Sequence, residues 1–175
     1  MKKSISIIIL LFVAFFSVNA SAQSSKLVGT WVGEGEYDAQ MNATAVPTLI
    51  FKANNTGSIT MSYEMSSALD ETSSLMAKIK INVPMRWSYS NSTINGTFNT
   101  ESTTINIDEL KVASQDPYVE ELMQSYIPQL KQMLLGEFNK AKQKLPKTDS
   151  FKVVSITGNT LTLIQEGKQR TYIRK

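Results

Sequence analysis

One stretch of the chain alternates strictly between apolar and polar residues, and this pattern constrains the fold more than any other feature. Its apolar positions are spaced two apart, at Ile79, Ile81, Val83, Met85, Trp87 and Tyr89. A shorter stretch repeats the pattern, with apolar positions at Ile59, Met61, Tyr63 and Met65. Successive side chains of a strand point to opposite faces, so both patterns predict half-buried antiparallel strands.

Shorter apolar runs and turn signals divide most of the remaining chain into further strands. We expect these strands over 27–37, 48–52, 93–99, 103–112, 151–156, 161–165 and 170–174. Residues 39–46 are small and polar and predict a loop, and Asn91-Ser92 predicts a turn. Asn95-Gly96 is also a hairpin signal, and this alternative stays open. The apolar parity changes within one strand, which predicts a bulge near Asp108-Glu109.

A helical period replaces the strand period between Asp116 and Pro146. The apolar positions are now three and four apart, at Met123, Ile127, Leu130, Leu134, Phe138, Ala141 and Leu145. This spacing predicts one amphipathic helix. Asp116 is a good N-cap residue, and Pro117 is a good first residue of a helix. Pro128 and Gly136 predict a break or kink within the helix.

Together these elements predict the fold class. About eight or nine short antiparallel strands with one buried face are typical of a barrel or a sandwich. The broken helix is inserted before the last three strands, and its apolar stripe would pack on the outside or at the open end of a barrel. No linker divides the chain, so we expect a single domain over residues 23–175.

The first 22 residues have the pattern of an export signal. Lys2 and Lys3 precede an apolar run from Ile7 to Phe16, and Ala20-Ser21-Ala22 is an A-x-A cleavage site. The apolar run is too short to span a membrane as a helix. Gln23 follows the site in place of Cys, which excludes a lipoprotein anchor there. We therefore expect a protein exported to a bacterial periplasm or to the extracellular space.

The composition excludes several kinds of chemistry. The sequence contains no Cys and no His, which excludes a Ser-His-Asp triad, a thiol nucleophile and an HExxH zinc site. Glu34 and Glu36 share a strand parity opposite to that of Trp31 and should point outward. The net charge of +3 falls close to neutral once Lys2 and Lys3 are removed, so nothing points to nucleic acid. We expect no enzymatic activity, no cofactor and no metal.

A short motif near the expected mature N-terminus resembles a known family. Gly29-Thr30-Trp31, with Leu49-Ile50-Phe51-Lys52 and the closing Thr171-Tyr172-Ile173-Arg174, is similar to the bacterial secreted lipocalin-like domains of the calycin superfamily. The resemblance implies a lipocalin-like barrel in which Trp31 closes the floor and Arg174 or Arg170 packs over its ring. The family's middle Thr-Asp-Tyr motif is missing, and the helix precedes the last three strands instead of following the eighth.

The inward side chains of the alternating strands allow two interpretations. They form either a solid core or the wall of a cavity for an apolar molecule, because eight strands leave room for either. Methionine side chains repack around varied shapes, which favours the cavity. The candidate ligand-binding residues are Met61, Tyr63, Met65, Val83, Met85, Trp87 and Phe98.

The expected function is non-catalytic binding of a small, mainly apolar molecule in the barrel interior. The alternative is a protein-interaction or inhibitor module that has a solid core and uses its loops and helix. One basic run, at the end of the expected helix, is either a solvated face or a contact for an anionic ligand or a lipid head group. This run contains Lys140, Lys142, Lys144 and Lys147.

The export signal leads to a direct prediction. When the full-length chain is produced in a bacterial host and exported, N-terminal sequencing should start at Gln23, because signal peptidases cut after the A-x-A motif. An exported soluble protein that retained residues 1–22 would contradict the assignment.

Overall fold

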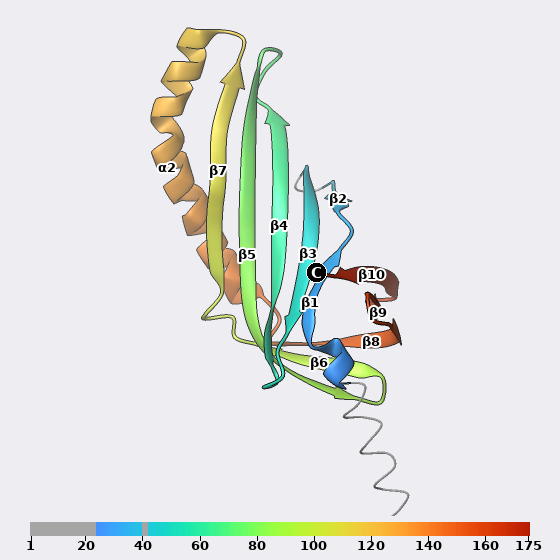
Figure 1. Ribbon diagram of the computed structural model, residues 1–175. Helices are drawn as coiled ribbons and strands as arrows, with labels where there is room; N and C mark the ends of the chain where they lie inside the picture. Colours follow the sequence, from blue (N-terminus) through green and yellow to red (C-terminus); the bar gives the residue numbers. More distant parts are fainter. Residues whose placement is uncertain (1–23, 40–41) are drawn as a thin grey trace, which may run out of the picture.

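The computed structural model describes residues 24–39 and 42–175. The expected signal peptide, residues 1–22, lies outside the described residues. The described part is mainly antiparallel sheet with one long helix (Figure 1). The strands are β1 (Gly29–Gly33), β2 (Glu36–Asp38), β3 (Ala43–Phe51), β4 (Thr56–Ala68), β5 (Ser73–Ser90), β6 (Thr93–Phe98), β7 (Thr104–Ser114), β8 (Thr148–Ile156), β9 (Thr160–Gln165) and β10 (Lys168–Arg174). The helical elements are a short helix over residues 24–27, the helix α2 (Pro117–Ala141) and the 3-10 helix η1 (Lys142–Lys144).

Eight of the strands close into an antiparallel barrel, which confirms the expected fold class. The strand order is β1-β10-β9-β8-β6-β5-β4-β3, and β1 pairs with β3 to complete the ring. The two pairings of β1 overlap at Trp31, whose register partners are Arg174 on β10 and Leu49 on β3. The helix precedes the last three strands, as expected.

The strand β5 has 18 residues and belongs to two structures at once. Residues Met85–Ser90 pair with β6 in the barrel, whereas Ser73–Asn82 pair with β7. The second pairing extends the sheet of β3, β4 and β5 beyond the barrel, and we call this extension the wing (Figure 1). Because the side-chain parity of β5 does not change along its length, the face that lines the barrel continues on the wing.

The wing contains the predicted bulge and carries charged residues on its outer face. Lys78 is opposite Glu109, but the next residue, Ile79, is opposite Ile107, so Asp108 is the extra residue of β7. Lys78 lies 3.6 Å from both Glu64 and Glu109, which point away from the apolar face. The bulge returns the apolar residues of β7 to the face that α2 covers.

The helix α2 begins as the sequence indicates. The side chain of Asp116 accepts a hydrogen bond from the backbone N–H of Tyr118 at 2.9 Å, and Pro117 is the first helical residue. The stripe residues from Met123 to Phe138 are partly buried, whereas Ala141 is exposed. Figure 1 shows α2 running beside β7.

The predicted break in the helix is wrong, because α2 is continuous through Pro128 and Gly136. Side chains on both sides of Pro128 donate hydrogen bonds to the neighbouring strand β7. The side chain of Gln124 donates to the carbonyl of Val112, and that of Lys131 donates to the carbonyl of Ile107. The single backbone hydrogen bond lost at a proline is thus offset by contacts with the neighbouring strand.

Two further expectations need correction. The predicted loop over 39–46 is wrong for its second half, because β3 begins at Ala43. Ala43 and Ala45 are buried, and their short side chains fit against the apolar face. The Asn95-Gly96 hairpin does not form, because both residues lie within β6. The turn is at Asn91-Ser92, where both residues have positive φ, as a tight hairpin requires.

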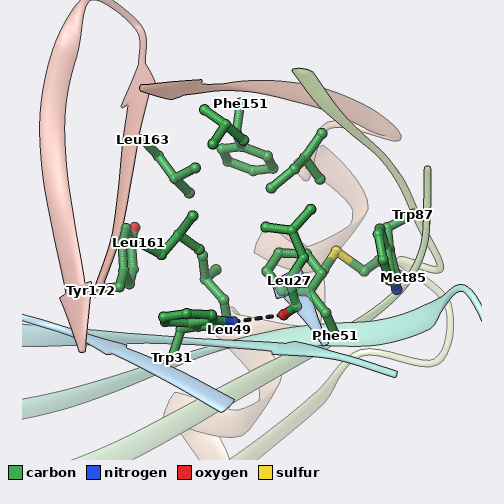
Figure 2. Packing of buried hydrophobic residues seen from close by; sticks show 12 residues of the cluster. Leu27, Trp31, Leu49, Phe51, Met85, Trp87, Phe151, Leu161, Leu163 and Tyr172 are labelled. Atoms are coloured by element: carbon green, nitrogen blue, oxygen red, sulfur yellow. Dashed lines mark hydrogen bonds between the residues drawn. The ribbon is translucent and has the colours of Figure 1, made fainter. Parts of the chain in front are cut away.

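The buried residues form two clusters on the same continuous face. The barrel core contains Leu27, Trp31, Leu49, Phe51, Met85, Trp87, Ile94, Phe151, Val153, Leu161, Leu163 and Tyr172 (Figure 2). The wing core is smaller and consists of Ala77, Ile79 and Ile107, against which α2 packs through Leu134, Leu135 and Phe138. The barrel therefore has a core of its own, while the wing depends on the helix for cover.

Trp31 and Arg174 hold the barrel closed. The Trp31 side chain is fully buried, and its indole N–H donates to the carbonyl of Leu27 at 2.7 Å (Figure 2). The guanidinium carbon of Arg174 lies 4.2 Å from the centre of the Trp31 ring. The contact implied by the resemblance is therefore made by Arg174, whereas Arg170 pairs with Glu36 at 2.9 Å.

Truncation of this contact should be costly. We expect Trp31→Ala to lower the free energy of unfolding by about 3–5 kcal/mol, because it leaves a large cavity beneath Arg174. Ile173→Ala is the control, since its side chain is 52% exposed on the neighbouring position of β10, and it should cost less than about 1 kcal/mol. Denaturant unfolding measures both values. Equal midpoints for Trp31→Ala and the unmodified protein would contradict the role of Trp31.

Candidate functional site

A pocket of about 250 Å³ opens at the mouth of the barrel, between β3–β4 on one side and β9–β10 on the other. Its floor is apolar and its edge is polar. The floor residues are Pro47, Leu49, Ile59, Met61 and Phe151. The edge residues are Gln165, Glu166, Lys168, Arg170 and Tyr172. We call this pocket the barrel mouth.

Strand register builds the floor. Pro47 is opposite Met61, and Leu49 is opposite Ile59, so two successive apolar pairs of β3 and β4 lie side by side. These pairs share the face that lines the barrel. Phe151, at the buried position of β8, approaches from the other side of the barrel and belongs to its core. The mouth is therefore the place where the barrel core comes to the surface.

Polar side chains with fixed partners surround this floor. The side-chain amide of Gln165 donates to Asp149 at 2.7 Å, and Arg170 is held by its ion pair with Glu36. Tyr172 is only 3% exposed, and burial raises the pKa of its phenol above the ordinary value. The edge thus offers hydrogen-bond donors beside an apolar surface, a combination that orients a small ligand.

The structure places two of the candidate residues at or near the mouth. Met61 is part of the floor. Val83 is partly buried on β5, opposite Ile59, at the boundary between the barrel and the wing. The role of both residues in binding stays a prediction.

The other five candidates lie elsewhere. Met85 and Trp87 belong to the barrel core, and Phe98 packs against it. Tyr63 and Met65 pack on the wing core beneath α2. The seven residues therefore share one continuous face but do not line one cavity, because the barrel occupies only the second half of β5.

Most of the residues at the mouth were not predicted from the sequence. Leu49 and Phe151 stand at apolar positions of expected strands, which was the available signal. Their proximity follows only from barrel closure, and so does the proximity of Arg170 and Tyr172. Glu34 and Glu36 are exposed, as their parity predicts, but Glu36 also has a role in holding Arg170.

Neither a metal site nor a membrane-spanning helix is found in the part of the chain that the structure describes. Within 24–39 and 42–175, no three acidic side chains gather closely enough to hold a metal ion. No helix in these ranges is long and apolar enough to cross a membrane.

The raised pKa of Tyr172 predicts a pH dependence. A neutral phenol is favoured in the folded state, so its contribution to stability is full below the unfolded pKa of about 10 and is lost as pH rises through the folded pKa. Between about pH 9 and about pH 11.5, the stability of the unmodified protein should therefore fall more than that of Tyr172→Phe. Denaturant unfolding at each pH measures this difference.

A matched variant separates this effect from general alkaline unfolding. Tyr118→Phe removes a phenol that is 74% exposed, so its stability should follow that of the unmodified protein over the same range. Parallel stability curves for Tyr172→Phe and the unmodified protein would show that burial of the phenol has no such effect.

Comparisons with known proteins add little to this geometry. No family model matches the chain, and no curated protein matches it. A crystal structure of Rv2717c from M. tuberculosis is similar at 11% sequence identity, covering 89% of this chain and 97% of that one, with a TM-score of 0.28. A likeness at this TM-score carries no argument about fold or function.

Proposed function

We propose that the chain is an exported, non-catalytic binding protein for a small, mainly apolar molecule that sits in the barrel mouth. The observation that carries the proposal is the apolar floor, which exposes part of the barrel core inside a ring of polar side chains. Apolar surface that is concave and edged by a few oriented donors is typical of small-molecule sites.

The filled interior of the barrel favours a ligand site at the mouth over a site deeper inside. Twelve side chains form the barrel core, and the largest fully buried ones include Trp31 and Phe51. An eight-stranded barrel filled in this way has little width left for a ligand lower down. The ligand therefore rests on the upper layer of the core, and about 250 Å³ limits it to a compact molecule.

Tyr172 at the edge and Met61 in the floor would give the site its selectivity. The phenol of Tyr172 is neutral at ordinary pH, so it can donate a hydrogen bond to a ligand oxygen. Met61 supplies a flexible thioether that adapts to the shape of an apolar body. A molecule with one polar end and an apolar remainder matches this arrangement.

The export part of the proposal and the lipocalin-like assignment are supported by other residues. The pattern of residues 1–22 supports export, and the buried Trp31 ring beneath Arg174 supports a lipocalin-like barrel floor. These observations concern location and architecture, whereas the mouth concerns the ligand.

A second candidate function rests on a different surface. Four large apolar side chains are exposed along one side of α2: Tyr118, Leu122, Tyr126 and Met133. Their spacing puts them on one stripe, next to the stripe that faces the wing. Exposed apolar stripes of this kind mark contacts with other proteins, so a protein-interaction or inhibitor module is the alternative.

A filling variant tests the proposed function. We expect the unmodified protein to bind an apolar fluorescent probe, and we expect Met61→Trp to weaken that binding by at least about tenfold, because the indole would occupy the pocket. Glu64→Trp is the control, since it adds the same ring at an exposed position on the opposite face of β4. Fluorescence titration measures binding, and denaturant unfolding checks that both variants fold.

The result separates the two candidate functions. No probe binding by the unmodified protein, or equal loss in both variants, would overturn the ligand-binding proposal. In that case the stripe on α2 becomes the better account, and Leu122→Glu would be the first variant to examine for loss of a protein partner.

A further inference from the structure

A second, larger hollow lies where β5 passes from β7 to β6, and nothing above assigns it a role. Its volume is about 560 Å³, and it shares no lining residue with the barrel mouth. Pairing with β7 ends at Asn82, and pairing with β6 begins at Met85, so the sheet divides at this point. We call this space the crossing hollow.

Backbone hydrogen bonds hold the walls of the crossing hollow. The N–H of Asn99 donates to the carbonyl of Pro84 at 2.8 Å, which ties the β6–β7 loop to β5. The N–H of Phe98 donates to the carbonyl of Lys147 at 2.8 Å, which ties the segment before β8 to β6. These bonds are made by the backbone, so the position of the walls is fixed by the path of the chain and not by side-chain rotamers.

The floor of the crossing hollow is apolar. Gly57, Met85 and Phe98 are register neighbours on β4, β5 and β6, so they form one row across three strands. A Cβ atom at position 57 would collide with the carbonyl oxygen of Ile50, so no side chain can cover that corner. The row therefore leaves the thioether of Met85 and the ring of Phe98 as the floor.

The rim of the crossing hollow is positively charged. Lys52, Arg86 and Lys147 come from three separate segments, and Glu101 is the only acidic residue among the described residues that line the hollow. Within the described ranges, these three basic side chains have no hydrogen bond or ion pair. Other basic side chains, such as Lys111 and Arg170, have acidic partners. Three cations that line one hollow without an acidic partner create a local field that attracts an anion.

We propose that the crossing hollow binds a small amphipathic anion, namely a carboxylate attached to a medium-length hydrocarbon body. Arg86 presents the planar fork that matches a carboxylate, and the two lysines add charge beside it. The hydrocarbon body lies on Met85 and Phe98. A neutral apolar molecule would leave the cations unmatched, and a bare anion would leave the floor uncovered.

Octanoate is the probe, with octan-1-ol and acetate as its two partial analogues. We expect octanoate to bind at least about tenfold more tightly than either analogue, because only octanoate satisfies both the rim and the floor. Added salt should weaken octanoate binding, since the rim charges are exposed and screened. Titration calorimetry of the exported protein measures the affinities.

Methyl NMR of the methionines identifies the site. Met85 lines the crossing hollow and Met61 lines the barrel mouth, so their ¹³C-labelled methyl signals report the two places separately. Octanoate should shift the Met85 signal and leave the Met61 signal in place. Met85→Leu and Met61→Leu assign the two signals.

Charge variants complete the test. The double variant Arg86→Gln with Lys147→Gln should weaken octanoate binding by at least about tenfold. The control removes two exposed lysines outside the hollow, Lys144→Gln with Lys152→Gln, and should change binding by less than about twofold.

Several outcomes would overturn the proposal. Absence of octanoate binding, equal affinity for octan-1-ol, or equal affinity for acetate would each contradict an amphipathic anion site. So would equal losses in the two double variants, or a shift at Met61 alone. A shift at Met61 alone would at the same time support the barrel mouth as a ligand site, so the two proposals fail separately.

Discussion

The contact between Trp31 and Arg174 is the interaction on which the rest of the structure depends. Trp31 and Val32 are the residues at which β1 pairs with both β10 and β3, so Trp31 sits at the seam of the ring. Arg174 covers the indole and donates to the carbonyls of Lys26 and Val28, at 2.6 and 2.8 Å. Gly29 allows this approach, because a Cβ there would lie 2.8 Å from the guanidinium. One arginine of the last strand therefore holds the segment that leads into β1.

When the ring closes at this seam, the first part of β5 extends beyond the barrel. The excess strand pairs with β7, and the apolar face of that wing needs the helix α2 to cover it. Two hollows open at different places in this arrangement. The barrel mouth opens where the core meets the surface beside the wing, and the crossing hollow opens where the neighbour of β5 changes. The crossing hollow is thus a consequence of one long strand in a small barrel, whereas the barrel mouth is built by β3, β4, β8, β9 and β10.

Features that local sequence sets were predicted correctly, and features that distant contacts set were not. The alternation from Ile79 to Tyr89 predicted β5, the N-cap at Asp116 predicted the start of α2, and the parity change predicted the bulge at Asp108. Each of these features depends on neighbours in the sequence. The continuity of α2 through Pro128 could not be predicted, because it depends on hydrogen bonds to β7.

The sequence by itself determined most of the strands, the helical stripe, the inward and outward parity of their side chains, and the chemistry excluded by a chain without Cys or His. Only the tertiary structure decided which inward residues meet. Met61 and Met85 have the same parity and the same local pattern, yet one lines the barrel mouth and the other the crossing hollow. The physical reason is that parity assigns a face of a strand, whereas strand pairing decides what that face encloses.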